Sequence, residues 1–324
     1  MTTQKTSLSA CTLVGLMLAG AAAVAQNYPT KQVRFVVGFP AGGATDVVAR
    51  AISQHLAEAL GQPVVVDNRA GAASNIGAEI VATSAKDGHT IFMGTVSLAI
   101  NPSLYKKLAY DALKDFAAVT QVTDTPFLFV AHPSLPVKNV QDFIALARAK
   151  PGQLNYGSGG NGSGGHLFPV MFGSMAGVKL MHVPYRGASF ATTSILAGET
   201  IFMFDNIVTT LPLARAGKLR ALAVTTLKRS RAAEDIPTLA EAGVPGYDAN
   251  AWFGVFAPTG TPAAVIARLH AEISKIVKIP ENRDRFLALG AEPVGSTPDQ
   301  FAAFYRNEVA KWGKVVRESG AQID

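Results

Sequence analysis

Two glycine-rich stretches are the parts of this sequence best suited to binding a ligand. They span residues 156–166, which are mostly glycine and serine, and residues 39–46. Each stretch follows an apolar run typical of a strand and precedes the pattern of a helix. Backbone N–H groups at the start of a helix attract anions, and glycine lets a ligand oxygen come close to the backbone. The two stretches therefore predict two halves of one anion-binding site.

The longer stretch matches nucleotide and nucleophile motifs only in part. Residues 157–162 have the spacing of a dinucleotide fingerprint, but no acidic residue stands about 20 positions on to hold the ribose. Ser163 occupies the position where a phosphate loop needs lysine. Ser158 and Ser163 also lack the flanking glycine of a nucleophile elbow. A nucleotide site or a catalytic serine is thus disfavoured, while a plain flexible loop remains an alternative.

Polar side chains that follow apolar runs are the next candidates. Ser97 comes after the strand-like residues Thr90–Thr95, and Asp205 comes after the apolar residues 201–204. In parallel α/β sheets, ligands lie beyond the carboxyl ends of the strands. Asp205 is the strongest side-chain candidate, because a polar group there has little structural purpose. His166 either donates to the ligand or pins its own loop, and the sequence leaves both roles open.

Other charged and aromatic residues have simpler interpretations. Asp46 lies in the first turn of a predicted helix, where a carboxylate favours the helix dipole, so a structural role is expected. Arg69 and Arg186 could pair with a ligand, but such arginines more often lie on the surface or in ion pairs. Trp252 is more often a core residue than a ligand contact. The six histidines lack metal-ligand spacing, so neither a metal nor a cofactor is expected.

Residues 1–25 have the layout of a secretory signal. A lysine precedes an apolar run, and small residues ending at Ala25 form a cleavage site. We expect the mature chain to begin at Gln26 and to be exported. Cleavage also removes Cys11, the one cysteine, so no disulfide or thiolate metal site is expected.

The composition favours a soluble two-domain protein. Of 324 residues, 48% are hydrophobic and 16% charged, and the formal net charge is +6. After the signal, no apolar run approaches the ~20 residues of a membrane span. Lysine and arginine form no block, so nucleic-acid binding is not expected. A soluble monomer is the expected form.

The order of predicted elements indicates an α/β fold. Strands and helices alternate in two series, and each series contains one of the glycine-rich stretches; such alternation is typical of mostly parallel sheets flanked by helices. Two connecting segments, residues 122–125 and 247–251, are predicted to act as the hinge of a cleft. The expected domains are residues 26–123 plus 250–324, and residues 124–249.

Further motifs accompany the glycine-rich stretches along the chain. They are residues 183–187, 219–224, 236–243 and 252–254. Together these stretches resemble the substrate-binding receptors of tripartite tricarboxylate transporters, the Bug-type periplasmic proteins, over essentially the whole mature chain. The resemblance implies a two-domain, type II periplasmic-binding-protein fold of the Venus-flytrap kind, with the ligand in the interdomain cleft. It also implies capture of a small carboxylated solute, such as a di- or tricarboxylate, an amino acid or an aromatic acid, and transient delivery to membrane permease subunits.

The resemblance also implies how the ligand is held. The two glycine-rich loops grip a carboxylate from opposite walls through backbone N–H groups and bound water, and Asp205 lies near the far end of the ligand. Side chains away from the carboxylate, Phe253 among them, are expected to distinguish ligands. The expected ligand contacts are Phe39, Pro40, Ala41, Gly42, Gly43, Ser97, Gly157, Ser158, Gly159, Asn161, Gly162, Ser163, His166, Tyr185, Asp205 and Trp252.

Two other functions remain open at the level of sequence. A ligand-sensing protein that presents its solute to a signalling partner needs the same cleft. A hydrolase or transferase could use the glycine-rich loops as an anion site, but the sequence lacks a nucleophile, a base and an orienting acid together. No catalytic residue is therefore expected.

Overall fold

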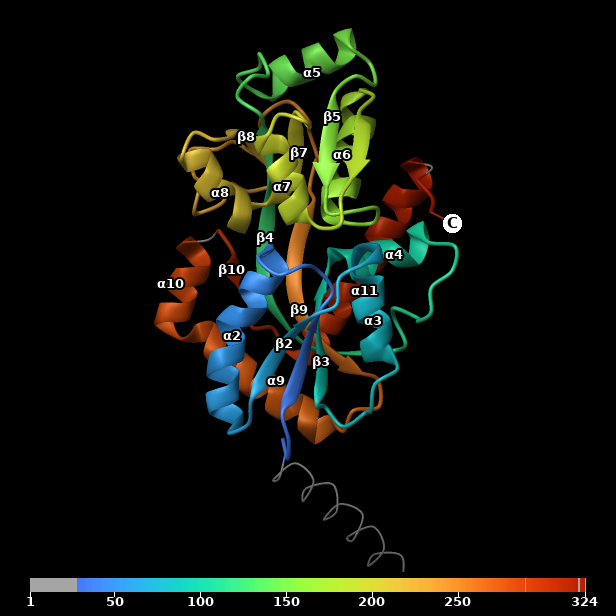
Figure 1. Cartoon of the computed structure of the whole chain (residues 1–324), viewed down its shortest axis with the longest axis vertical. Coiled ribbons are helices and arrows are strands. Elements are labelled where there is room, and N and C mark those ends of the chain that lie inside the picture. Colours follow the sequence, from blue (N-terminus) through green and yellow to red (C-terminus); the bar gives the residue numbers. More distant parts are fainter. Residues whose placement is uncertain (1–27, 289, 320, 324) are drawn as a thin grey trace, which may run out of the picture.

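The computed structural model describes residues 28–288, 290–319 and 321–323 as two lobes joined by long strands (Figure 1). Strands β4 (Phe116–Ala131) and β9 (Asn250–Pro258) run side by side between the lobes. The predicted signal, residues 1–25, lies outside the described residues. Within the described part of the chain, no helix combines the length and the apolar character needed to cross a bilayer.

The first lobe contains the N-terminal strands and the C-terminal helices. Its parallel strands follow the order β2–β1–β3, and β3 continues antiparallel into β9 and then β4. A short strand, β10, pairs antiparallel with β4. The bounds are β1 Val33–Val37, β2 Val64–Asn68, β3 Thr90–Thr95, β10 Glu292–Pro293, α2 Ala44–Leu60, η1 Ala72–Ser74, α3 Asn75–Ala82, α4 Val96–Leu104, α9 Ala263–Lys278, α10 Pro280–Ala288 and α11 Pro298–Ser319.

The second lobe repeats this arrangement with the middle of the chain. Strand β5 pairs parallel with β6 and β7, while β7 and β8 pair antiparallel with the far end of β4. The bounds are β5 Asn155–Ser158, β6 Met181–Pro184, β7 Phe202–Asn206, β8 Arg220–Val224, α5 Val140–Ala149, α6 Gly164–Ala176, α7 Ala188–Leu196 and α8 Ile207–Arg215.

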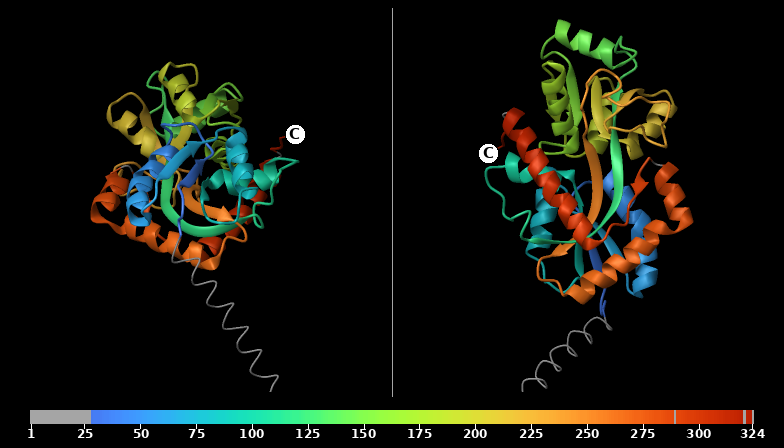
Figure 2. Two further views of the ribbon diagram at one scale, coloured as in Figure 1. Left: turned by 60° about the horizontal axis from the view of Figure 1, so that its bottom comes forward. Right: turned by 180° about the vertical axis from the view of Figure 1, so that it is seen from behind.

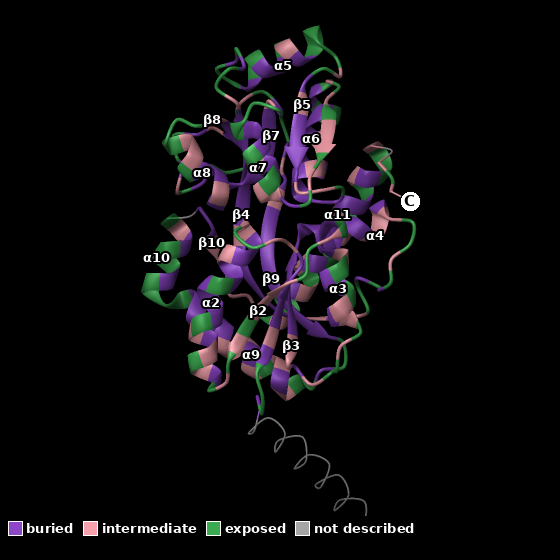
Figure 3. Cartoon of the chain, in the orientation of Figure 1, coloured by how far each residue is buried: buried purple, intermediate pink, exposed green. Residues whose placement is uncertain are grey.

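Apolar strands and the buried faces of the helices form the core of both lobes, and the exposed helix faces point outward (Figure 3). In the second lobe, Phe129 of β4 contacts the rings of Phe143, Phe172 and Phe204. Phenylalanine and valine are the commonest buried residues of the strands, and both suit a pleated surface packed on both faces. The two-lobed α/β fold predicted from the sequence is thus confirmed.

The predicted connecting segment at residues 122–125 is part of strand β4. Residues 122–125 continue the strand instead of forming a connecting loop, because Thr123, Asp124 and Thr125 pair with β9. The hydroxyls of Thr123 and Thr125 are buried and lie 3.2 Å apart in a hydrogen bond. At the junction, β4 therefore pairs with β9 on one side and, at Thr123 and Asp124, with β10 on the other. We retain residues 26–123 plus 250–324 and residues 124–249 as the proposed domains.

Helix α11 lies along the first lobe and reaches the second (Figure 2, right). Its start is a capping box, since the Gln300 N–H donates to Thr297 Oγ1 at 3.3 Å and the Thr297 N–H donates to Gln300 Oε1 at 3.0 Å. Near its end, the ring of Trp312 stacks on Phe168 of α6 at 5.1 Å between centroids. Glu308 Oε2 accepts both indole N–H groups, from Trp312 at 3.0 Å and from Trp252 at 3.1 Å. Helix α11 therefore holds Trp252 in the core.

Candidate functional site

The beginnings of five helices meet at one cavity between the lobes. Four of them, α2, α4, α6 and α7, place their first residues on its wall, and β7 ends there just before α8. The first N–H groups of a helix have no partner within the helix, and the helix dipole makes them attract negative charge. The cavity contains about 600 Å³ of unoccupied space, part of it open to solvent. Its lining is Phe39, Pro40, Gly43, Ala44, Thr45, Thr95, Val96, Ser97, Phe127, Gly159, Ser163, Gly164, Gly165, Ala188, Ser189, Asp205, Asn206, Ala251 and Phe253.

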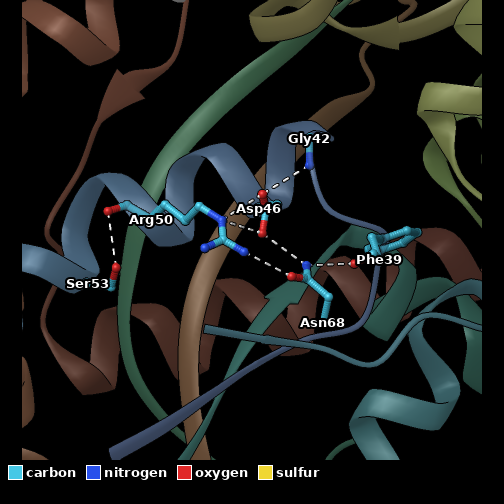
Figure 4. Close-up of polar contacts among 6 residues, drawn as sticks. All are labelled: Phe39, Gly42, Asp46, Arg50, Ser53 and Asn68. Atoms are coloured by element: carbon cyan, nitrogen blue, oxygen red, sulfur yellow. Dashed lines mark hydrogen bonds and ion pairs between the residues drawn. The ribbon is translucent and has the colours of Figure 1, made fainter. Parts of the chain in front are cut away.

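The shorter glycine-rich loop is braced from behind by a polar cluster (Figure 4). The carboxylate of Asp46 accepts a hydrogen bond from the Gly42 N–H at 3.0 Å and another from the Arg50 guanidinium at 2.9 Å. The Asn68 amide donates to Asp46 and to the Phe39 carbonyl, both at 3.0 Å. Burial alone raises the pKa of Asp46, but these hydrogen bonds outweigh it and hold the pKa below its ordinary value. Asp46 therefore has the structural role expected from the sequence.

The longer loop is held by its own polar groups. Ser163 Oγ donates to the Gly160 carbonyl at 2.7 Å, and the Gly160 N–H donates to Ser158 Oγ at 3.1 Å. The Gly162 N–H donates to Nδ1 of His166 at 3.2 Å. Burial lowers the pKa of His166 to about 4, which keeps this nitrogen available as an acceptor at neutral pH. His166 thus pins the loop, which is one of its two predicted roles.

Asp205 is the acidic group of the cavity. It is 5% exposed, and Thr209 Oγ1 donates to its carboxylate at 3.0 Å. Burial raises the pKa of Asp205 to about 6, although bonds from Asn206 and Thr209 act against this. Among the described residues on the cavity wall, none is lysine, arginine or histidine. A bound anion there would therefore meet N–H groups and hydroxyls rather than a cationic side chain.

The structure brings about half of the predicted contacts to this cavity. Those on its wall are Phe39, Pro40, Gly43, Ser97, Gly159, Ser163 and Asp205, together with Phe253. Those that it places elsewhere are Ala41, Gly42, Gly157, Ser158, Asn161, Gly162, His166, Tyr185 and Trp252.

The local structure explains why several of these residues do not line the cavity. Gly157 and Ser158 are part of strand β5, and Trp252 faces helix α11. Tyr185 and Asn161 line a neighbouring hollow on the other side of the loops. The hydroxyl of Tyr185 bonds to Ser194 instead of facing the cavity. A direct ligand contact by any of these residues stays a prediction.

Sequence reasoning missed the start of α7. Ala188 and Ser189 line the cavity after Gly187, whose φ of 145° is in a region that favours glycine. Strand, glycine and helix follow one another there as they do in the two glycine-rich loops. The short motif at residues 185–187 was a signal for this third loop.

The lobes touch each other at the mouth of the cavity. The Tyr105 hydroxyl, from the first lobe, donates to the Asn161 carbonyl at 3.0 Å. A Cβ atom at Gly187 would lie 2.6 Å from Cγ of Pro40, so these loops are in close contact. The two lobes are thus in direct contact next to the cavity.

Replacing Tyr105 by phenylalanine should weaken ligand binding by about 2- to 10-fold, because a hydrogen bond contributes ~0.5–1.5 kcal/mol. The bond to Asn161 joins the two lobes, so we expect movement of the lobes apart to break it. Calorimetric titration measures the change. Tyr110→Phe is the matched control, since its hydroxyl bonds to Asn75 within one lobe at 2.6 Å. Equal weakening in both variants would contradict a role in closure.

Metal binding finds no support in the described residues. Across these residues, no group of three or more His, Cys, Asp or Glu side chains could hold a metal ion. The side chains around the cavity instead suit a small organic anion with an apolar body.

Comparison with known families gives a match along most of the chain. A model described as tripartite tricarboxylate transporter family receptor (TctC) matches residues 48–321. Protein BugT of Bordetella pertussis is 37% identical over 317 residues, which cover 96% of this chain and 97% of that protein.

Solved structures show the same likeness in three dimensions. The structure described as R. palustris Rpa4515 with adipate has a TM-score of 0.88 and 39% identity, covering 90% of this chain and 98% of that one. MatC (Rpa3494) from Rhodopseudomonas palustris with bound malate has a TM-score of 0.85 and 34% identity, covering 89% and 100%. The similarity thus extends over nearly the whole length of these proteins.

Proposed function

The chain belongs to the receptor family of tripartite tricarboxylate transporters, and from this we propose that it captures a small organic carboxylate outside the cytoplasm. It then delivers this solute to the membrane permease of such a transporter. The fold is the two-domain type II fold of periplasmic binding proteins, and the family is one of receptors rather than enzymes. Release after cleavage near Ala25 and action as a monomer complete the proposal.

The observation that carries this proposal is the meeting of helix beginnings at a cavity without a cationic side chain. A carboxylate accepts several hydrogen bonds, and charged acceptors form bonds about twice as strong as neutral ones. The N–H groups are fixed by α2, α6 and α7, so little entropy is lost when the ligand binds. Backbone groups alone can therefore supply specific recognition of a carboxylate.

The rest of the cavity suits the carbon body of the ligand. The rings of Phe39, Phe127 and Phe253 line it, and Asp205 stands among them as an acceptor or, when protonated, a donor. Adipate and malate, which two of the similar structures contain, have this combination of carboxylates and a short carbon chain. We infer that the ligand is of this general class.

A thermal-shift screen of residues 26–324 against mono-, di-, tri- and aromatic carboxylates tests the proposal. A ligand at about 100 times its Kd stabilises the fold by ~2.7 kcal/mol, which raises the unfolding midpoint visibly. We expect a shift with one chemical subset of the carboxylates. A shift with phosphate esters or nucleotides, and with no carboxylate, would show that the proposed function is wrong.

A further inference from the structure

Two polar side chains join the strands that connect the lobes. Asp124 of β4 lies opposite Trp252, and Asn250 of β9 lies opposite Pro126, so both belong to the same stretch of the ladder. The Asn250 amide donates to Asp124 Oδ2 at 2.9 Å. This hydrogen bond therefore lies at the proposed hinge, on the pair of strands that any movement of one lobe against the other must bend or twist.

The other oxygen of each side chain has no partner. Asp124 Oδ1 and Asn250 Oδ1 are both buried, and neither has a partner of good hydrogen-bond geometry among the described residues. The Thr125 N–H lies near the Asp124 carboxyl and lowers its pKa. An ionised carboxylate and an amide carbonyl are both acceptors, so they cannot bond to each other. Leaving such a group buried and unpaired costs about 1–3 kcal/mol, and more if it is charged.

Protonation of Asp124 would give both of these unpaired oxygens a hydrogen-bond partner. A proton on Asp124 Oδ1 makes that atom a donor, and the acceptor without a partner on the adjoining side chain is Asn250 Oδ1. Acid and amide then form a ring of two hydrogen bonds, one in each direction. We propose that Asp124 is a proton-binding site at the hinge, where its protonated carboxyl joins β4 to β9 through two hydrogen bonds with Asn250.

The surroundings of Asp124 favour the protonated form. Burial, followed by the negative charges of Glu308 on α11 and of Asp248, raises the pKa of Asp124 to about 6, although the Thr125 N–H and Lys311 act against this. Lys228, Arg229, Arg231 and Glu292 line the same groove. Two of these cations already have acidic partners, since Arg229 pairs with Glu241 at 2.8 Å and Arg231 approaches Glu292, within the groove, at 3.8 Å.

The direction of the pH effect follows from this. The carboxyl binds its proton more tightly in this conformer than in water, where an aspartic acid has a pKa of about 3.9. The conformer is therefore favoured as pH falls through about 6 towards 4, and it loses this advantage as pH rises through about 6. If the opened hinge hydrates Asp124, lower pH favours closure of the lobes.

The first test is a carboxyl-carbon NMR titration of the wild-type protein without ligand. We expect the Asp124 resonance, assigned by its loss in Asp124→Asn, to titrate near pH 6. A midpoint near the ordinary value of about 3.9 would overturn the proposal. The titration needs no ligand, so its outcome is independent of the proposed function.

The second test compares ligand affinity at pH 7.5 and pH 5, and it rests on the proposed function. Wild-type protein should bind its carboxylate up to about tenfold more tightly at pH 5. Asp124→Asn should lose the part of the pH response that is due to Asp124, because its amide donates to Asn250 at every pH, and it should keep any part that is due to Asp205. Asp205→Asn is the control for Asp205, the other carboxyl whose pKa is raised to about 6. This variant should keep the pH response that is due to Asp124. An unchanged pH response in Asp124→Asn would refute the coupling.

Discussion

Leucine in place of Gly159 should abolish binding of every carboxylate, with Kd raised by at least about 100-fold, or ~2.7 kcal/mol. A Cβ atom at this position would lie 3.1 Å from the backbone nitrogen of Ala188 and 3.5 Å from the carbonyl carbon of Gly187. These are backbone atoms at the start of α7, so they cannot turn aside as a flexible side chain could. The added side chain would lie in the cavity beside the Ala188 N–H group. Calorimetric titration with the ligand found by thermal shift measures the loss.

A control separates this effect from general damage by a larger residue. Gly246→Leu places the same side chain where a Cβ atom has no neighbour within 4 Å. Its φ of 76° is unfavourable for leucine, so this variant should lose some stability and keep its affinity. Unchanged affinity in Gly159→Leu would show that the ligand does not bind between these two loops.

Removing the carboxylate of Glu308 should cost about 3–5 kcal/mol of folding stability. Glu308 is 6% exposed, and one of its oxygens accepts hydrogen bonds from the indole N–H groups of both Trp252 and Trp312. Glu308→Ala leaves two buried indole N–H groups without an acceptor, at ~1–3 kcal/mol each. The unfolding midpoint should fall by about 10 °C, as measured by calorimetry.

Two further variants test the cause of this loss. Glu308→Gln keeps an oxygen in reach of both indoles and should retain most of the stability. Glu318→Ala, on the same helix, breaks only an exposed pair with Lys314 at 3.8 Å and should change little. If Glu308→Gln is as unstable as Glu308→Ala, hydrogen bonding to the tryptophans is not what stabilises this contact.

The sequence predicted the elements well because their signals are local. Apolar runs, glycines at the ends of strands and the capping residues of α5 and α11 depend only on near neighbours. The Asp142 N–H, for example, donates to Asn139 Oδ1 at 2.8 Å, as the predicted helix start requires. The same locality explains why the two glycine-rich loops could be assigned to a binding site.

What the sequence could not determine was the face on which each strand residue lies. Trp252 and Phe253 are neighbours, and successive side chains of a strand point to opposite faces. Phe253 lines the cavity, whereas Trp252 packs under α11. The choice depends on the pairing of β9 with β3 and β4, which are far away in the sequence. A shift of one residue would exchange the two roles.

The sequence pattern did not predict that β4 is one continuous strand, for a related reason. The polar residues 123–125 weaken the strand pattern, and their pairing with β9 and β10 keeps them extended. The start of α7 was missed because a single glycine, Gly187, marks it. Both features depend on partners that a single sequence does not identify.

The path of the chain also bears on the order in which the protein can fold. Strand β3 pairs with β9 through Thr95 and Phe253, so one edge of β3 stays open until the chain has passed through the second lobe. The second lobe is one continuous segment, whereas the first also needs α9 and α11, near the end of the chain. A chain emerging from the ribosome therefore completes the first lobe last. Such delay keeps the N-terminal part unfolded for longer, which suits passage through a membrane before folding.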